Sequence, residues 1–317
     1  MDLAPIVLFV YNRPWHTEQT LCALAENELA KDSTLYIYAD GPKKNSSQEE
    51  LNKIKETRAV LRKKNWCKEI HIIESEKNKG LANSVIKGVT EVVNDYGKII
   101  VLEDDLITSK GFLNYMNNGL ARFQDRQEVM QISGHCFPID NISKNNTSFF
   151  VPLSTSWGWA TWKRAWGKFD SKASGYEILK SDELLKKEFD LDNSFPYSTM
   201  LIKQMESDRI DSWSIRWWWA IFKKKGITLF PDKSLVKNIG FGIEGTHTQG
   251  NDPFILNDFD RNYFINNFPD TTHINTKHLQ EITKYLRFSK NTQQNLKQNS
   301  FSVAKKIMIK IQNFLFK

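Results

Sequence analysis

The stretch KIIVLEDDLITS, from Lys98 to Ser109, runs from four apolar residues directly into three acids, Glu103, Asp104 and Asp105. The apolar run is typical of a buried strand, and the acids would then stand at its carboxyl end. Neighbouring carboxylates raise one another's pKa, so three acids at a strand end are costly without a positive charge beside them. A divalent cation would supply that charge. The alternative is a solvated turn that caps a helix beginning near Ser109, where acids favour the positive helix end.

The sequence around this stretch alternates short β-rich runs with helical stretches, which indicates βαβ units and a mostly parallel sheet. Ligands of such sheets gather at the carboxyl ends of the strands, and each expected strand here ends in a polar cluster. No GxGxxG motif follows the first strand and no GxxxxGK[ST] motif occurs, so a nicotinamide-binding or P-loop protein is not indicated. A sheet that binds a nucleotide without these glycine motifs needs another device, and a metal held by carboxylates is the obvious one. The expected strands are APIVLFVYN, TLYIYAD, EIHIIES and KIIVLED, and the helices between them span Pro14 to Leu29, Ser46 to Lys64 and Leu81 to Tyr96.

The composition is that of a globular α/β protein. The 317 residues are 40% hydrophobic, which is enough to fill a core without disulfides. No stretch approaches the ~18 apolar residues of a membrane span, and no signal peptide is recognisable, so we expect a cytoplasmic protein. The cysteines show no CxxC spacing and indicate neither a zinc site nor a disulfide framework; they are Cys22, Cys67 and Cys136.

The net charge of +7 is concentrated at the carboxyl end. Residues 282–317 contain eight Lys or Arg and no acid, so the remainder has a net charge of −1 (+7 minus 8). A nucleic-acid-binding surface is therefore not expected. The last segment, SFSVAKKIMIKIQNFLFK, places apolar residues at helical spacing opposite lysines. Such a basic amphipathic helix either packs on the body or attaches reversibly to an anionic membrane surface.

The second half of the chain is rich in tryptophan, in STSWGWATWKRAW and in DSWSIRWWWAIFKKKGITLFP. Trp217, Trp218 and Trp219 occupy consecutive positions of an expected helix and cannot all face one way. At least one of the three is therefore expected in the core.

Five segments of the chain, in order and in rough spacing over residues 4 to about 250, resemble one family. This family is the inverting glycosyltransferases of the glycosyltransferase A fold, in particular the N-acetylglucosaminyltransferase I type and its bacterial family 2 relatives. The resemblance implies an α/β, Rossmann-like fold with a mostly parallel central sheet flanked by helices, followed by a C-terminal helical tail. The segments are PIVLFVYNRPWHTEQTLCAL, IIVLEDDLITSKGF, TSWGWATWKRAW, DSWSIRW and FPDKSLVKNIGFGIEGTHTQG.

The resemblance also implies a division of labour along the chain. Residues 1–125 would form the nucleotide-sugar-binding half, and residues 126–270 the acceptor and catalytic half within the same core. Residues 271–317 would form the basic helical tail.

The acid triplet matches the family's version of the DxD metal motif. By this resemblance Asp105 would ligate Mn²⁺ or Mg²⁺, hard ions that take carboxylates together with substrate phosphates and water. Asp104 would face the ribose or the sugar, and Glu103 would support both acids. The metal would stabilise a departing diphosphate.

Four further residues are expected at the nucleotide. Asp40 would accept a hydrogen bond from the uracil ring, and Arg13 would lie near the base. Lys79 would reach the nucleotide, or is a surface lysine. His247 lies in a glycine-rich segment that would close over the donor, where it would contact a phosphate or complete the metal shell; a solvated turn is the alternative.

Inversion requires a general base that takes the proton of the acceptor hydroxyl. Asp211 is the candidate, with Asp208 as the alternative. The family has paired acids before the tryptophan at this point, whereas this chain has Asp211 followed by Ser212. Asp211 would otherwise be the N-cap of the following helix. Trp157 and Trp159 would offer flat apolar faces to an acceptor sugar.

The sequence therefore predicts a metal-dependent inverting glycosyltransferase with a UDP-sugar donor and a glycan or lipid-linked glycan acceptor. It would serve bacterial surface polysaccharide or lipid-linked oligosaccharide assembly at the inner face of the membrane. One alternative is a sugar-phosphate nucleotidylyltransferase, although VYNRPWHTEQ lacks the glycine-rich loop expected there. Another is an inactive nucleotide-sugar or glycan-binding module, against which the retained Asp211 argues.

Overall fold

The computed structural model describes residues 2–139, 145–207, 212–240 and 259–289. In these residues an eight-stranded sheet with the order β3-β2-β1-β4-β8-β6-β9-β7 forms the centre, and a two-stranded sheet pairs β5 with β10. The strands are β1 (Ile6–Val10), β2 (Thr34–Ala39), β3 (Glu69–Glu74), β4 (Lys98–Glu103), β5 (Leu106–Thr108), β6 (Val129–Ser133), β7 (Ser148–Val151), β8 (Trp159–Trp162), β9 (Ile227–Pro231) and β10 (Val236–Asn238).

The sheet is mostly parallel. Strands β3, β2, β1, β4, β6 and β9 run in one direction, and only β8 and β7 oppose them. The α/β class and the mostly parallel sheet flanked by helices are thus confirmed. Because β8 pairs directly with β4, strands from residues 1–125 and 126–270 belong to one sheet.

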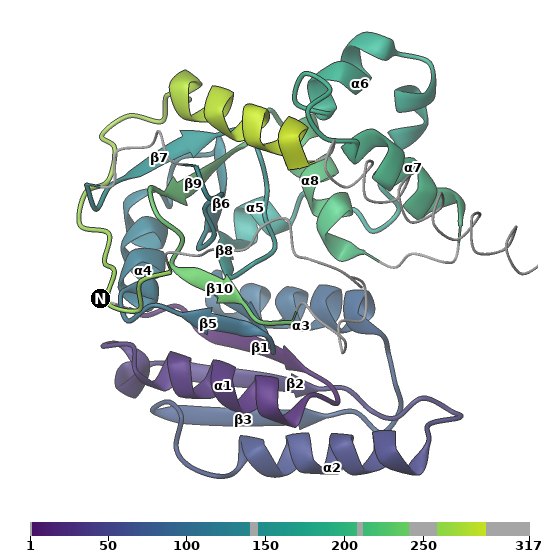
Figure 1. Cartoon of the computed structure of the whole chain (residues 1–317), viewed down its shortest axis with the longest axis vertical. Helices are drawn as coiled ribbons and strands as arrows, with labels where there is room; N and C mark the ends of the chain where they lie inside the picture. Colours follow the sequence, from purple (N-terminus) through teal and green to yellow (C-terminus); the bar gives the residue numbers. More distant parts are fainter. Residues whose placement is uncertain (1, 140–144, 208–211, 241–258, 290–317) are drawn as a thin grey trace, which may run out of the picture.

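Helices cover both faces of the sheet (Figure 1). Alternate residues of β1 show this, as Val7 and Phe9 pack with α3 and α8 whereas Ile6 and Leu8 pack with α1 and α4. The helices are α1 (Pro14–Ala25), α2 (Gln48–Leu61), α3 (Leu81–Tyr96), α4 (Phe112–Arg122), α5 (Lys163–Trp166), α6 (Glu183–Phe189), α7 (Tyr197–Glu206) and α8 (Trp213–Lys223), with short 3₁₀ turns at Ala30–Asp32 and Tyr176–Lys180 and a helical stretch at 276–289.

Local sequence signals explain where the first three helices begin and end. Pro14 occupies the first turn of α1, where its missing N–H has no cost. Ser47 and Glu50 form a capping box at the start of α2. Gly97 ends α3 in the left-handed conformation. The first helix is shorter than expected, since it ends at Ala25 rather than Leu29.

All three consecutive tryptophans of α8 are buried, which confirms and exceeds the expectation of at least one. Trp217 packs on Trp166, with ring centroids 5.1 Å apart, and Trp218 stacks on Phe189 at 5.6 Å. Helix α8 is enclosed because the segment around α6 and α7 covers the side turned away from the sheet (Figure 1).

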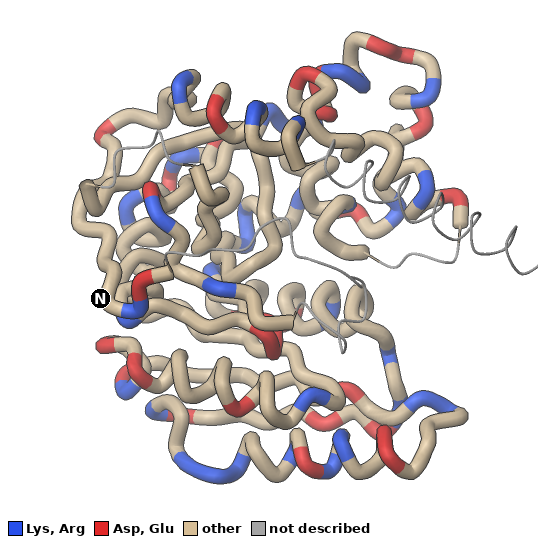
Figure 2. Tube along the Cα trace, viewed as in Figure 1, with Lys and Arg blue, Asp and Glu red and all other residues tan. Residues whose placement is uncertain are grey.

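Charges of both signs are interspersed along α2 and around α6 (Figure 2). Within α2, for example, Lys53 pairs with Glu49 at 2.9 Å. Among the helices in the described ranges, none has the length and apolar content needed to cross a membrane. The segment 300–317, expected to be a basic amphipathic helix, lies outside the described residues.

Gly158 offers a test of packing between β8 and β10. Its φ of +58° disfavours any side chain, and an added Cβ would lie 2.8 Å from Val236 Cγ1. Gly97 shares a positive φ of +75° but has nothing within 4 Å. We expect Gly97→Ala to lower the free energy of unfolding by about 1 kcal/mol, and Gly158→Ala by about 2–4 kcal/mol, because overpacking adds to backbone strain. Urea unfolding measures both, and equal losses would contradict the packing explanation.

Candidate active site

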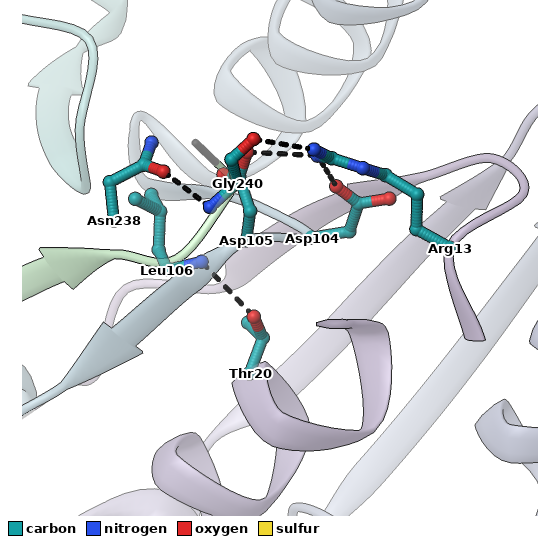
Figure 3. Close-up of polar contacts among 7 residues, drawn as sticks. All are labelled: Arg13, Thr20, Asp104, Asp105, Leu106, Asn238 and Gly240. Carbon is teal, nitrogen blue, oxygen red and sulfur yellow. Dashed lines mark hydrogen bonds and ion pairs between the residues drawn. The ribbon is translucent and has the colours of Figure 1, made fainter. Parts of the chain in front are cut away.

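The acids after β4 surround a positive charge from the end of β1. Arg13 Nη1 donates to Asp105 Oδ2 at 2.9 Å and to Asp104 Oδ1 at 3.3 Å (Figure 3). Arg13 Nη2 donates to the Gly240 carbonyl at 3.0 Å. The parallel pairing of β1 with β4, with Phe9 opposite Glu103, brings these groups to one edge. Arg13 was expected near the nucleotide base. In this structure its guanidinium lies between the carboxylates of Asp104 and Asp105, at the position where a metal ion would bind.

Hydrogen bonds from α1 and β10 hold Asp105 and its neighbours in the sequence. The Ile239 amide donates to the Asp105 carbonyl at 2.8 Å, and the Leu106 amide donates to Thr20 Oγ1 of α1 at 3.1 Å. The Gly240 amide donates to Asn238 Oδ1 at 2.7 Å (Figure 3). A Cβ on Gly240 would lie 2.0 Å from Asp105 Oδ2, so only glycine fits here without displacing the acid.

Burial makes the acid cluster electrostatically costly. Burial, together with the charge of Asp105, raises the pKa of Asp104 to about 7, although Arg13 opposes the shift. Burial and then the two neighbouring carboxylates raise the pKa of Glu103 to about 8, while a hydrogen bond with the Trp213 side chain works the other way. A further positive charge at this point would therefore be strongly favoured.

The residues present fit a hard divalent ion that is shared with a substrate. In the described part of the chain, no three His, Cys, Asp or Glu side chains converge on a point that could hold a metal by themselves. Asp104 and Asp105 nevertheless direct two carboxylates at one position. Mg²⁺ and related ions commonly bind through one or two carboxylates and complete their shell with phosphate oxygens and water.

Asp40 organises a loop rather than presenting a free carboxylate. Its oxygens accept from the backbone amides of Gly41 at 2.8 Å, Lys79 at 2.9 Å and Gly80 at 3.1 Å, and from Asn78 Nδ2 at 3.0 Å. The Lys79 side chain is exposed. Asp40 thus ties the loop after β3 to the end of β2, and a base that donates to it would share oxygens already in use.

The two tryptophans expected at the acceptor have different surroundings. Trp159 is fully buried on β8 and stacks on Trp213 with ring centroids 5.0 Å apart. Because a central strand is covered on both faces, no ring face of Trp159 is open to a sugar, and its expected acceptor role does not hold. Trp157 is partly exposed, and its ring lies 4.7 Å from that of His135.

Asp208, Asp211 and His247 lie outside the described residues. The segment that follows Asp211 is described and reaches the acids, because Trp213 hydrogen-bonds Glu103. The N-cap of α8 is Ser212, which does not favour the alternative in which Asp211 is the N-cap. Ser212 is held from both sides, as its amide donates to Gln204 Oε1 at 2.7 Å and its carbonyl accepts from Arg216 Nε at 3.0 Å.

Sequence reasoning missed Thr20, Asn238 and Trp213, which hold the acid cluster in place. Their contacts come from segments far apart in the chain, so no local pattern signals them. Gly240 was identified only as part of a glycine-rich segment. Its close approach to Asp105 is a tertiary feature.

His135 supplies a pH test for the second half. It is 3% exposed, and burial lowers its pKa to about 3. The unfolded chain therefore binds one more proton than the folded chain between about pH 3 and 6.5. We expect the stability from neutral His135 to be complete above about pH 6.5 and to decline as the pH falls, by at most ~1.4 kcal/mol per pH unit.

The measurement is the free energy of unfolding by urea between pH 4 and 7. His135→Gln should reduce the slope against pH by close to one proton. His71→Gln serves as the control, because the His71 side chain is 41% exposed on edge strand β3. A slope unchanged by His135→Gln would contradict the assignment.

Residues 6–182 match the sequence profile of a family described as Glycosyl transferase family 2. The matched range includes Arg13, Asp40 and the acid triplet, and ends before α8. No protein with a curated description matches the chain.

Solved structures resemble the chain only distantly. The mannosyltransferase PcManGT from Pyrobaculum calidifontis, in complex with GDP-Man and Mn²⁺, is 12% identical with a TM-score of 0.31, over 51% of this chain and 47% of that one. S. aureus TarS 1-349 is 11% identical with a TM-score of 0.38, over 74% and 60%. A UDP-glucose pyrophosphorylase complexed with UDP-glucose is 10% identical with a TM-score of 0.38, over 77% and 96%. The chain thus spans less than two thirds of the first two, and at this similarity none of the three informs donor or acceptor.

Proposed function

Since the chain belongs to glycosyl transferase family 2, it is a glycosyltransferase, and we propose that it transfers a sugar from a UDP-sugar to a glycan acceptor with inversion. We further propose that Mn²⁺ or Mg²⁺ is its cofactor. The observation that carries the proposal is the pair of carboxylates, Asp104 and Asp105, directed at one cation at the carboxyl edge of the sheet. That edge is where ligands of parallel α/β sheets bind.

The chain's own residues would divide the work as follows. Asp105 would hold the metal with Asp104 beside it, and Glu103 would support both through its contact with Trp213. When bound, a divalent ion supplies charge neutralisation for the leaving diphosphate. The loop after β3, whose Lys79 amide donates to Asp40, would bind the nucleotide. His247 would contact a phosphate of the donor.

Asp211 would act as the general base on the acceptor side. Its carboxylate would take the proton of the acceptor hydroxyl as that oxygen forms a bond to the anomeric carbon. The bond from the anomeric carbon to the diphosphate oxygen breaks at the opposite face, which inverts the configuration. Trp157 would offer a ring face to the acceptor.

The acceptor is proposed to be a glycan or lipid-linked glycan of bacterial surface polysaccharide or lipid-linked oligosaccharide assembly. The basic segment 290–317 supports peripheral attachment to an anionic membrane surface, since it contains six Lys and no acid, and the sequence of its last 18 residues has apolar residues at helical spacing. This attachment would place the enzyme at the inner face of the membrane.

The first test is release of UDP from a panel of UDP-sugars with Mn²⁺, Mg²⁺ or EDTA. We expect metal-dependent release, reduced about 100-fold or more by Asp105→Ala and by Asp211→Asn, since a general base contributes 10²–10⁴-fold. Asp95→Asn, at an exposed position of α3, is the matched control and should retain activity. Release that persists in EDTA and in both variants would overturn the proposal, and release of pyrophosphate would identify a nucleotidylyltransferase.

A second test concerns Arg13 and the metal in the absence of donor. A metal that binds Asp104 and Asp105 must replace their hydrogen bonds to Arg13, and charged hydrogen bonds contribute ~1.5–3 kcal/mol. We therefore expect Arg13→Gln to raise the affinity for Mn²⁺ about tenfold, measured by the electron paramagnetic resonance of free Mn²⁺. Arg62→Gln, which removes an ion pair to Glu74, is the control. Unchanged affinity in Arg13→Gln would show that metal binding does not compete with Arg13.

A further inference from the structure

An apolar cavity of about 250 Å³ lies beside the candidate active site. Its walls come from the loop after β6, the loop before β8, the residues that lead into and form α7, the first half of α8 and the helical stretch 276–289. The side chains that give it its character are Phe137, Trp157, Phe195, Met200, Ile215 and Trp218. Among the described residues that line it, none is Asp, Glu, Lys, Arg, Asn or Gln.

Two of the five hydroxyl groups of the lining are hydrogen-bonded within the protein. Thr155 Oγ1 lies 2.5 Å from Ser133 Oγ, and Ser214 Oγ lies 3.0 Å from Ser212 Oγ. His135 is buried and stays uncharged at neutral pH because burial lowers its pKa to about 3. A pocket that fixes a bare sugar needs several oriented polar groups for the sugar hydroxyls. This lining instead favours burial of hydrocarbon.

The start of α8 links the cavity to the acids. Trp213 hydrogen-bonds Glu103, and the next residue, Ser214, lines the cavity. A molecule in the cavity would therefore contact the same end of α8 that contacts the acid cluster.

We propose that this cavity binds an uncharged hydrocarbon aglycone of the acceptor, attached next to the sugar that receives the transfer. The inference rests on the proposed function. It restricts the class of acceptor to glycolipid-type molecules and excludes free saccharides. At ~30 Å³ per water the volume equals about eight waters, so the cavity takes the part of the chain nearest the sugar and not a whole lipid.

The test compares octyl β-D-glucopyranoside, below its micelle concentration, with methyl β-D-glucopyranoside. Both are titrated into the full-length protein by isothermal titration calorimetry. Each buried methylene is worth about fourfold in affinity, so we expect the octyl glycoside to bind at least about tenfold more tightly. Equal affinities would overturn the proposal.

Two substitutions locate the effect. Met200→Gln makes the lining more polar at a side chain that is 41% exposed, and Ser156→Phe fills the cavity from a partly exposed position. Each should reduce the preference for octyl over methyl about threefold or more. Leu184→Gln, at a leucine that is 80% exposed on α6 and outside the cavity, should leave it unchanged. A preference that survives both lining variants would also overturn the proposal.

Failure of the proposed function is separately visible. Release of UDP from donor without acceptor measures that function and does not require the cavity. Glycoside binding, in turn, does not require donor turnover. An octyl preference that depends on Met200, in a protein that turns over no UDP-sugar, would support the cavity's specificity and contradict only the proposed function.

Discussion

A guanidinium held between a buried and a partly buried carboxylate is the interaction on which the site depends. Arg13 follows β1, Asp104 and Asp105 follow β4, and Gly240 follows β10, so three distant segments meet at one charge. Without a cation the acids would repel one another in surroundings that already raise the pKa of Asp104 to about 7. The pairing of β1 with β4 therefore requires that a positive charge lie beside the acids, in addition to close packing of the two strands.

Residues from the second half of the chain also hold the acid cluster in place. Strand β8 runs antiparallel beside β4, and its Trp159 stacks on Trp213 of α8. Trp213 in turn hydrogen-bonds Glu103. The aromatic core of the second half thus sets where α8 begins, next to the acids. The start of α8, which follows the proposed base Asp211 in the sequence, is therefore held at the acid cluster by packing with β8.

Local pattern was sufficient to predict the first four strands, the helices between them and the placing of acids at a strand end. Each depends on periodicity, turn residues or capping within a few positions, as in Ser47 and Glu50 of α2. The burial of Trp159 could not be predicted in this way. It follows from the insertion of β8 between β4 and β6, which places an apparent sugar-binding ring inside a central strand.

The same limit applies to Arg13 and Asp40. Their positions after two parallel strands correctly placed them at the carboxyl edge of the sheet, and their role toward a ligand stays a prediction. Their partners depend on the order of strands and on loops such as the one that Asp40 binds through the amides of Lys79 and Gly80. A sequence shows that a carboxylate stands at this edge, but the remaining capacity of its oxygens to bind a ligand is decided by the folded loop.

The acid cluster and the cavity have opposite polarity. The acids and Arg13 lie at the carboxyl end of β4, whereas the described lining of the cavity, which includes the start of α8, bears no charge. Apolar walls lower the local dielectric, which makes isolated carboxylates more costly and their attraction to a cation stronger. The burial that raises the pKa of Asp104 and Glu103 would thus also strengthen the attraction of the acids to a bound cation. It would also exclude water from a donor bound there. A charged donor would bind at the acids, and the hydrocarbon group of an acceptor would bind in the cavity. The difference in polarity would therefore fix the orientation of the two substrates relative to each other.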